Sequence, residues 1–118
     1  MSVPSFADRL ARVRHRFVST LESKIDDAYE SIAGLADGTP SAPASIAATY
    51  RSIHGVVGVG PTVGFPSTGQ AARAVEELLH EAQQRQRGLT ADEILHFKKC
   101  LHALREAADR ELEFFYSF

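Results

Sequence analysis

Apolar residues recur at steps of three and four along most of this chain, and no other feature constrains its fold as strongly. Such steps place side chains on one stripe of an α-helix. The first segment with this pattern covers residues 6–35. It is longer than a usual helix of a globular protein, so it forms either one long helix or two helices with a break between them. Its stripe consists of Phe6, Leu10, Val13, Phe17, Leu21, Ile25, Ala28, Ile32 and Leu35.

Three further helices follow from the same pattern. The second is predicted over about residues 43–59, because Pro61 lacks a backbone donor and disfavours helical geometry at the residue before it. The third is predicted over residues 66–87. The fourth begins at Thr90, which forms a capping box with Glu93, and continues to the C-terminus. The predicted stripe of the second helix consists of Ile46, Tyr50, Ile53 and Val57.

No segment of comparable length alternates with a period of two, so the sequence predicts no β-sheet. Four amphipathic helices with short connections indicate an all-α fold, an antiparallel up-down four-helix bundle with a long N-terminal helix. The chain has 118 residues, the length of one domain, and we expect a single domain over residues 1–118. This architecture serves many functions, so the function has to be inferred from particular residues.

Charge and cysteine content exclude several classes of function. The net charge is −2, and such a chain has no strong field that would attract nucleic acid or an anionic membrane. The single cysteine, Cys100, excludes an internal disulfide framework and a four-cysteine zinc site. No stretch of the sequence is apolar enough to span a membrane, and we expect no secretory signal, because residues 1–10 contain no long apolar run. We therefore expect a cytoplasmic monomer that binds no nucleic acid, membrane or metal.

The segment around His54 departs from ordinary helix composition. Gly55 and Gly58 lie inside the predicted second helix, where each glycine costs about 1 kcal/mol relative to alanine. Gly58 is one turn beyond His54 and Gly55 is beside it, so the imidazole would stand on a helix surface with few side chains. Ile53 and Val57 are expected to point into the bundle, which turns His54 toward solvent. A neutral imidazole has a nucleophilic nitrogen that can accept a phosphoryl group.

This arrangement resembles the histidine phosphotransfer domain of two-component phosphorelays. It is most similar to the phospho-accepting N-terminal domain of chemotaxis-type histidine kinases. In that family one glycine follows the histidine by four residues and another by ten, as Gly58 and Gly64 follow His54. Residues 62–65, Thr-Val-Gly-Phe, are similar to the family's Thr-Phe-Gly-Phe turn.

Val75 and Glu76 extend the resemblance, because the family carries an apolar residue and then a glutamate at these distances from the histidine. The Glu-Leu-Leu run at residues 77–79 is also similar. The resemblance implies that His54 is phosphorylated on Nε2 while Glu76 holds the proton on Nδ1. It also implies that Mg²⁺ and the acidic catalytic pocket belong to the partner, a receiver domain or a histidine kinase. The chain itself would be a phosphocarrier without a cofactor of its own, and not an enzyme.

Val57 is the main departure from the family, which usually has a lysine at this position in contact with the phosphoryl group. Arg73, three residues before Glu76 on the same helical face, is the first candidate for a replacement cation. Arg51, one turn before His54, is the second. The partner is expected to dock over the second and third helices through a contact of modest area. The expected contact residues are Ala47, Arg51, Gly55, Gly58, Gln70 and Arg73.

Several alternatives remain open. His54 could be a surface histidine without a role, although the glycines and the glutamate at the family's spacing would then be unexplained. The chain could be an inactive bundle that binds a receiver or kinase without carrying phosphate, and Val57 favours this alternative. It could also be a structural subunit that assembles through its aromatic tail, residues 114–118. The arginines near the N-terminus form a solvated helix face or a docking site for an acidic partner.

Overall fold

The computed structural model describes residues 3–116. Within this range there is no β-strand, and the only extended pairing is an isolated bridge between Ala36 and Leu89. The prediction of an all-α fold is therefore confirmed. The elements are α1 (Phe6–Glu30), α2 (Ile32–Leu35), α3 (Ala42–Val59), the 3₁₀ helix η1 (Gly60–Val63), α4 (Pro66–Gln84) and α5 (Ala91–Tyr116).

The long periodic segment at the N-terminus is divided into two helices. α1 begins with a capping box, in which the Ser5 hydroxyl accepts a hydrogen bond from the Asp8 N–H and the Asp8 carboxylate accepts one from the Ser5 N–H. α1 ends at Glu30, and α2 follows after Ser31. The Ser31 hydroxyl donates to the Ala28 carbonyl and so competes with the helical backbone at the break.

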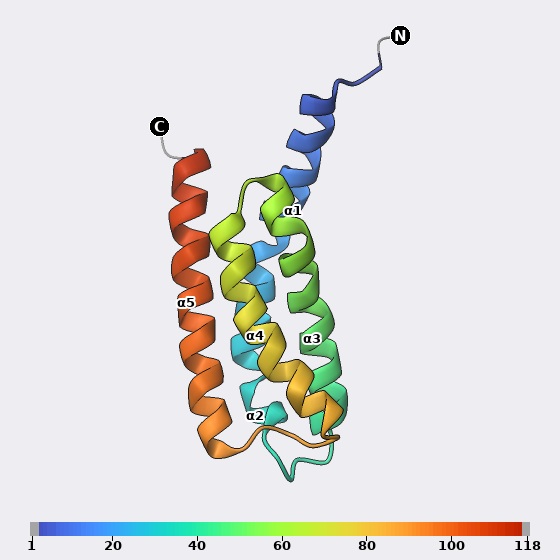
Figure 1. Ribbon diagram of the computed structural model, residues 1–118, viewed down its shortest axis with the longest axis vertical. Coiled ribbons are helices and arrows are strands. Elements are labelled where there is room, and N and C mark those ends of the chain that lie inside the picture. Colours follow the sequence, from blue (N-terminus) through green and yellow to red (C-terminus); the bar gives the residue numbers. More distant parts are fainter. Residues whose placement is uncertain (1–2, 117–118) are drawn as a thin grey trace.

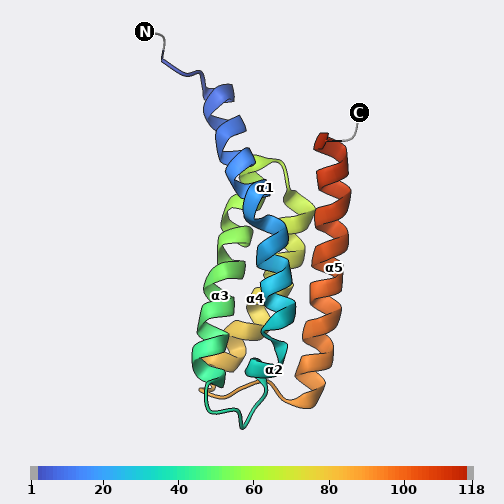
Figure 2. The same ribbon diagram turned by 180° about the vertical axis from the view of Figure 1, so that it is seen from behind.

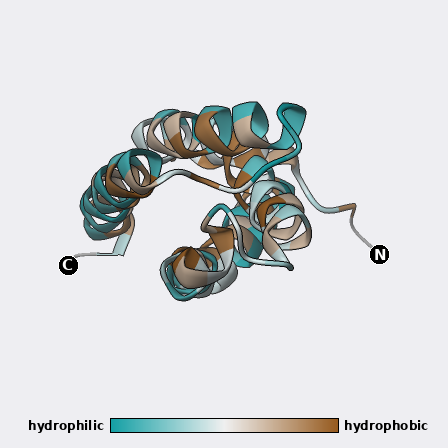
Figure 3. Cartoon of the chain, turned by 90° about the horizontal axis from the view of Figure 1, so that it is seen from below, coloured by the Kyte–Doolittle hydropathy of each residue, from teal (hydrophilic) through white to brown (hydrophobic). Residues whose placement is uncertain are grey.

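The four long helices lie side by side along the long axis of the molecule, and successive ones run in opposite directions (Figure 1). α4 packs against both α3 and α5. In the view from behind, α1 lies in front of α4, in contact with α3 and α5 (Figure 2). α2 and the loop after it close one end, while η1 connects α3 to α4 at the other. Viewed along the axis, the apolar parts of the helices are directed toward a shared interior (Figure 3).

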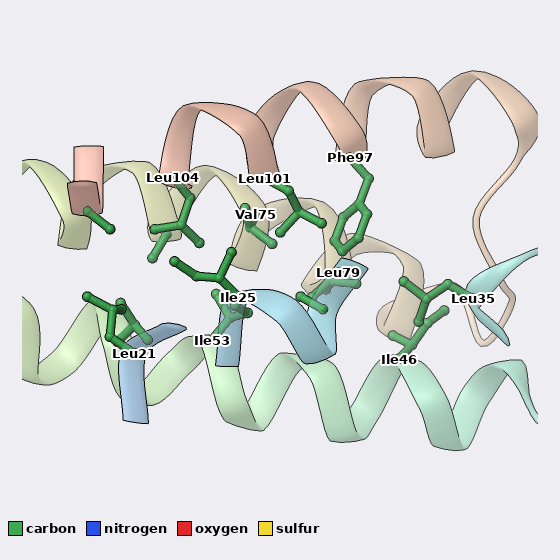
Figure 4. Packing of buried hydrophobic residues seen from close by; sticks show 14 of the residues in the cluster. Leu21, Ile25, Leu35, Ile46, Ile53, Val75, Leu79, Phe97, Leu101 and Leu104 are labelled. Atoms are coloured by element: carbon green, nitrogen blue, oxygen red, sulfur yellow. The ribbon is translucent and has the colours of Figure 1, made fainter. Parts of the chain in front are cut away.

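Large apolar side chains from all four long helices fill this interior (Figure 4). Burial of such side chains is the main source of stability for a chain that has no metal cluster or disulfide among its described residues. The fully buried side chains include Leu21 and Ile25 of α1, Ile46 and Ile53 of α3, Val75 and Leu79 of α4, and Phe97, Leu101 and Leu104 of α5.

The buried stripe of α3 is rotated relative to the prediction. Thr49 and Val56 are buried, whereas Tyr50 and Val57, which were expected on the stripe, are half-buried at its edge. Both sets fit steps of three and four, so the period alone could not distinguish them. The packing of α1 and α2 against α3 decides between them. The Thr49 hydroxyl lies 3.4 Å from the Ser31 hydroxyl, so its polar group has a partner in the buried position.

The connection between α3 and α4 is a tight turn that requires glycine. η1 leads into Gly64, whose φ of +95° favours glycine, and a Cβ there would lie 2.6 Å from the Phe115 ring. At Gly69 a Cβ would lie 2.7 Å from Cδ of Pro61. The absence of side chains at these two positions lets α4 start close beside the end of α3. α3 itself ends where the proline predicts.

The first turn of α4 is capped by a side chain from α5. α4 begins at Pro66 and has no side-chain N-cap of its own. The Glu111 carboxylate accepts hydrogen bonds from the Thr68 N–H at 2.6 Å, the Thr68 hydroxyl at 2.7 Å and the Ser67 N–H at 3.3 Å. It pairs donors that have no partner within the helix and places negative charge at the positive end of the α4 dipole.

We expect Glu111→Ala to lower the free energy of unfolding by about 1–3 kcal/mol, because the buried Thr68 hydroxyl and two backbone donors lose their acceptor. Glu77→Ala, at an exposed position of α4, should change it by less than about 0.5 kcal/mol. Chemical denaturation followed by circular dichroism measures both values. Equal stability of the two variants would show that Glu111 does not cap α4.

Candidate functional site

His54 of α3 and Glu76 of α4 meet at the interface of these two helices. The His54 Nδ1 atom lies 2.7 Å from Glu76 Oε2. The His54 side chain is 62% exposed, whereas that of Glu76 is 17% exposed. A carboxylate only accepts hydrogen bonds, so in the neutral ring Nδ1 carries the proton and Nε2 keeps its lone pair. The contact therefore fixes the tautomer in which Nε2 can act as a nucleophile.

Tyr50 restricts the orientation of the same imidazole ring. Its ring stacks on that of His54, with 5.6 Å between centroids and 14° between planes. Tyr50 is half-buried and packs on the core, so it is a fixed platform for the more exposed histidine. The His80 ring lies 5.8 Å from the Tyr50 ring. Tyr50 was not predicted as a site residue, although its position one turn before His54 would have allowed it.

Gly55 and Gly58 are not required by the packing of the helices. A Cβ added at Gly58 would meet nothing within 4 Å, and one at Gly55 would meet only Lys24 Nζ at 3.6 Å. This differs from Gly64 and Gly69, where a side chain would collide. Glycine in a helix interior is unfavourable, and folding does not explain it at these two positions. The open surface beside His54 thus favours a role in contact with another molecule.

Three cations border the His54 surface from three helices. Arg51 is exposed on α3, one turn before His54. Arg73 is exposed on α4 and lines a shallow hollow with Val57. Lys24 of α1 reaches α3 beside Gly55 and was not found by sequence reasoning, because no local pattern pairs it with this segment. In the described part of the chain neither arginine bonds to His54 or Glu76.

The six residues predicted to contact a partner are all accessible to some degree. Arg51, Gly58, Gln70 and Arg73 are exposed, and Ala47 and Gly55 are partly exposed. They belong to α3 and α4, the two helices that also carry His54 and Glu76.

Two other features are absent among residues 3–116. Among them no group of three or more histidine, cysteine or acidic side chains could hold a metal ion. None of the described helices is long and apolar enough to cross a bilayer.

No protein-family model matches the chain, and no curated protein or solved structure is significantly similar to it. The function therefore has to be inferred from the residues around His54 and their geometry.

We expect Tyr50→Ala to release the His54 ring from its contact with Glu76, since a stacked aromatic pair contributes about 0.5–1.5 kcal/mol. The Nδ1–H tautomer of His54 should become less populated, as measured by ¹⁵N chemical shifts of the imidazole nitrogens. Tyr50→Phe keeps the ring and should leave these shifts close to the wild-type values. If the alanine variant keeps the wild-type tautomer, Tyr50 does not position His54.

Proposed function

We propose that this chain is a histidine phosphotransfer protein of a two-component phosphorelay, in which His54 accepts a phosphoryl group and passes it to an aspartate of a receiver domain. The observation that carries the proposal is the exposed His54 imidazole, bonded through Nδ1 to Glu76. Its surface is opened by Gly55 and Gly58, two glycines that the packing does not need.

The chemistry follows from the tautomer of His54. The Nε2 lone pair attacks the phosphorus of the donor, an N–P bond forms, and the P–O bond to the donor breaks with its electron pair leaving on the donor oxygen. The ring then bears a proton on Nδ1 and phosphorus on Nε2, and its positive charge is stabilised by the Glu76 carboxylate. In the onward step a carboxylate oxygen of the receiver attacks the phosphorus, and the electron pair of the broken N–P bond returns to Nε2.

In this proposal the chain is a carrier and not an enzyme, and His54 supplies only the nucleophile. The partner kinase or receiver would supply Mg²⁺ and the acidic pocket. Such a carrier would act in the cytoplasm. The antiparallel four-helix bundle of this class is supported by the alternating direction of α1, α3, α4 and α5 (Figure 1).

Lys24 and Arg73 are the cations that we assign to the phosphoryl group in place of the lysine missing at Val57. Lys24 approaches from α1 over Gly55, and Arg73 stands beside Val57 on α4. A phosphoryl group on His54 would add negative charge between them, and both side chains are long enough to adjust to it.

The second candidate is a binding module of the same fold that docks a receiver or kinase but carries no phosphate. Val57 favours it, because this half-buried aliphatic side chain replaces a direct phosphoryl contact.

We expect the wild-type chain to become labelled when it is incubated with phosphorylated receiver domains and Mg²⁺, and the label to be acid-labile as a phosphoramidate is. His54→Gln should abolish the label, because the amide has no nucleophilic ring nitrogen. His80 is a second exposed histidine near the site, so His80→Gln is the matched control and should keep the label. Binding of the receiver without label would favour the binding module. Label that persists in His54→Gln would refute the assignment of His54.

We expect Lys24→Gln to slow phosphotransfer about threefold to tenfold, since a partly exposed cation beside a charged group contributes about 1 kcal/mol. Lys98→Gln removes an exposed lysine of α5 and should leave the rate unchanged. Single-turnover transfer from a labelled receiver measures both rates. Equal rates for the two variants would exclude Lys24 from the phosphoryl site.

A further inference from the structure

One end of the molecule carries nearly all of its exposed large apolar side chains. α1 begins and α5 ends there, and both helices extend beyond the turn formed by η1 (Figures 1 and 2). Six of the seven exposed large apolar residues in the described part of the chain lie at this end. They are Val3, Phe6, Val13, Val59, Phe114 and Tyr116. An apolar cluster of this kind on a soluble helical surface is typical of an interaction site.

The α1 part of this surface is a continuation of the core stripe. Phe17 is 6% exposed, Val13 is 40% exposed and Phe6 is 72% exposed, although all three lie on one face of the helix. The stripe thus runs from the packed interior to a stretch where neither α3 nor α4 covers it. A helix end with such a stripe gains stability when another apolar helix packs against it.

The charges at this end differ in sign between the two helices. Residues 6–19 contain four arginines and one aspartate, a net charge of +3, whereas residues 106–116 contain four acidic residues and one arginine, a net charge of −3. The start of α1 is therefore basic and apolar, and the end of α5 is acidic and apolar. The two surfaces are complementary in charge, and every copy of the chain carries both of them.

Within one copy, the charges at the start of α1 are not paired with those at the end of α5. Arg14 of α1 contacts α5, with its guanidinium 4.5 Å from the Phe115 ring centroid, and its Nε donates to the Val63 carbonyl of η1. Arg12, Arg16, Asp109 and Glu113 are exposed on the same helix ends. Among the residues that the structure describes, none of these four takes part in an ion pair.

We propose that two copies of this chain associate through this end, with the start of α1 of each copy packed against the end of α5 of the other. Such a contact is made twice about a two-fold axis and closes as a dimer. It places Phe6 and Val13 against Tyr116, which shares a face of α5 with Asp109 and Glu113, and sets the arginines of α1 opposite these two acidic residues. The dimer departs from the monomer expected from the sequence, and it does not depend on the function of His54.

The experiment uses sedimentation equilibrium of the full chain from about 1 µM to about 1 mM, the range in which a modest interface is populated. We expect a concentration-dependent dimer whose dissociation constant increases with salt. Arg12→Glu with Arg16→Glu, and separately Asp109→Arg with Glu113→Arg, should each raise the dissociation constant about tenfold or more, because both contacts then join like charges. Circular dichroism checks that each variant is folded.

An equimolar mixture of the two charge-reversed variants is the decisive measurement. In a mixed pair both α1–α5 contacts again join opposite charges, so the mixture should regain an affinity within a few fold of the wild type. If a variant does not fold, Tyr116→Ser replaces it and should also weaken the dimer. The proposal is overturned by a wild-type chain that is monomeric up to 1 mM. It is also overturned by charge-reversed variants that dimerise as the wild type does, or by a mixture that does not recover.

Discussion

The close approach of α3 and α4 is the constraint on which the site depends. His54 and Glu76 are 22 positions apart in the chain, yet a hydrogen bond of 2.7 Å joins them. This distance is possible because the turn between the helices uses Gly64 at a positive φ and because Gly69 leaves room for Pro61. The Glu111 carboxylate then fixes the first turn of α4 from α5. The geometry of the imidazole is thus determined by packing at some distance from it.

Much of the fold and part of the site could be predicted from the sequence. The periodicity identified the four long helices and most of their ends, because Pro61 and the Thr90 capping box are local signals. The pairing of His54 with Glu76 was expected only from the resemblance to a family, since no local rule relates the two. Lys24 and the rotation of the α3 stripe could not be predicted, because both depend on how α1 packs on α3.

The glycines of this chain fall into two groups that the sequence alone could not separate. Gly64 and Gly69 are required by the backbone or by a close neighbour, so they serve the fold. Gly55 and Gly58 face open space or the end of a flexible lysine, so each lowers helix stability without a gain in packing. In a small domain, whose total stability is about 5–15 kcal/mol, a loss of this size at two positions one turn apart is substantial, and it supports the proposed role of the bare surface.

The two surfaces of this molecule have different physical character, and this difference bears on their partners. The His54 surface carries small residues and is bordered by cations, so a partner held there would gain little apolar burial and would separate readily, as the proposed carrier role requires. The end formed by α1 and α5 exposes several aromatic side chains, so a partner held there gains apolar burial as well as charge pairing. A lasting contact at the end and a transient one at His54 can therefore coexist in one chain, because they draw on different residues and different forces.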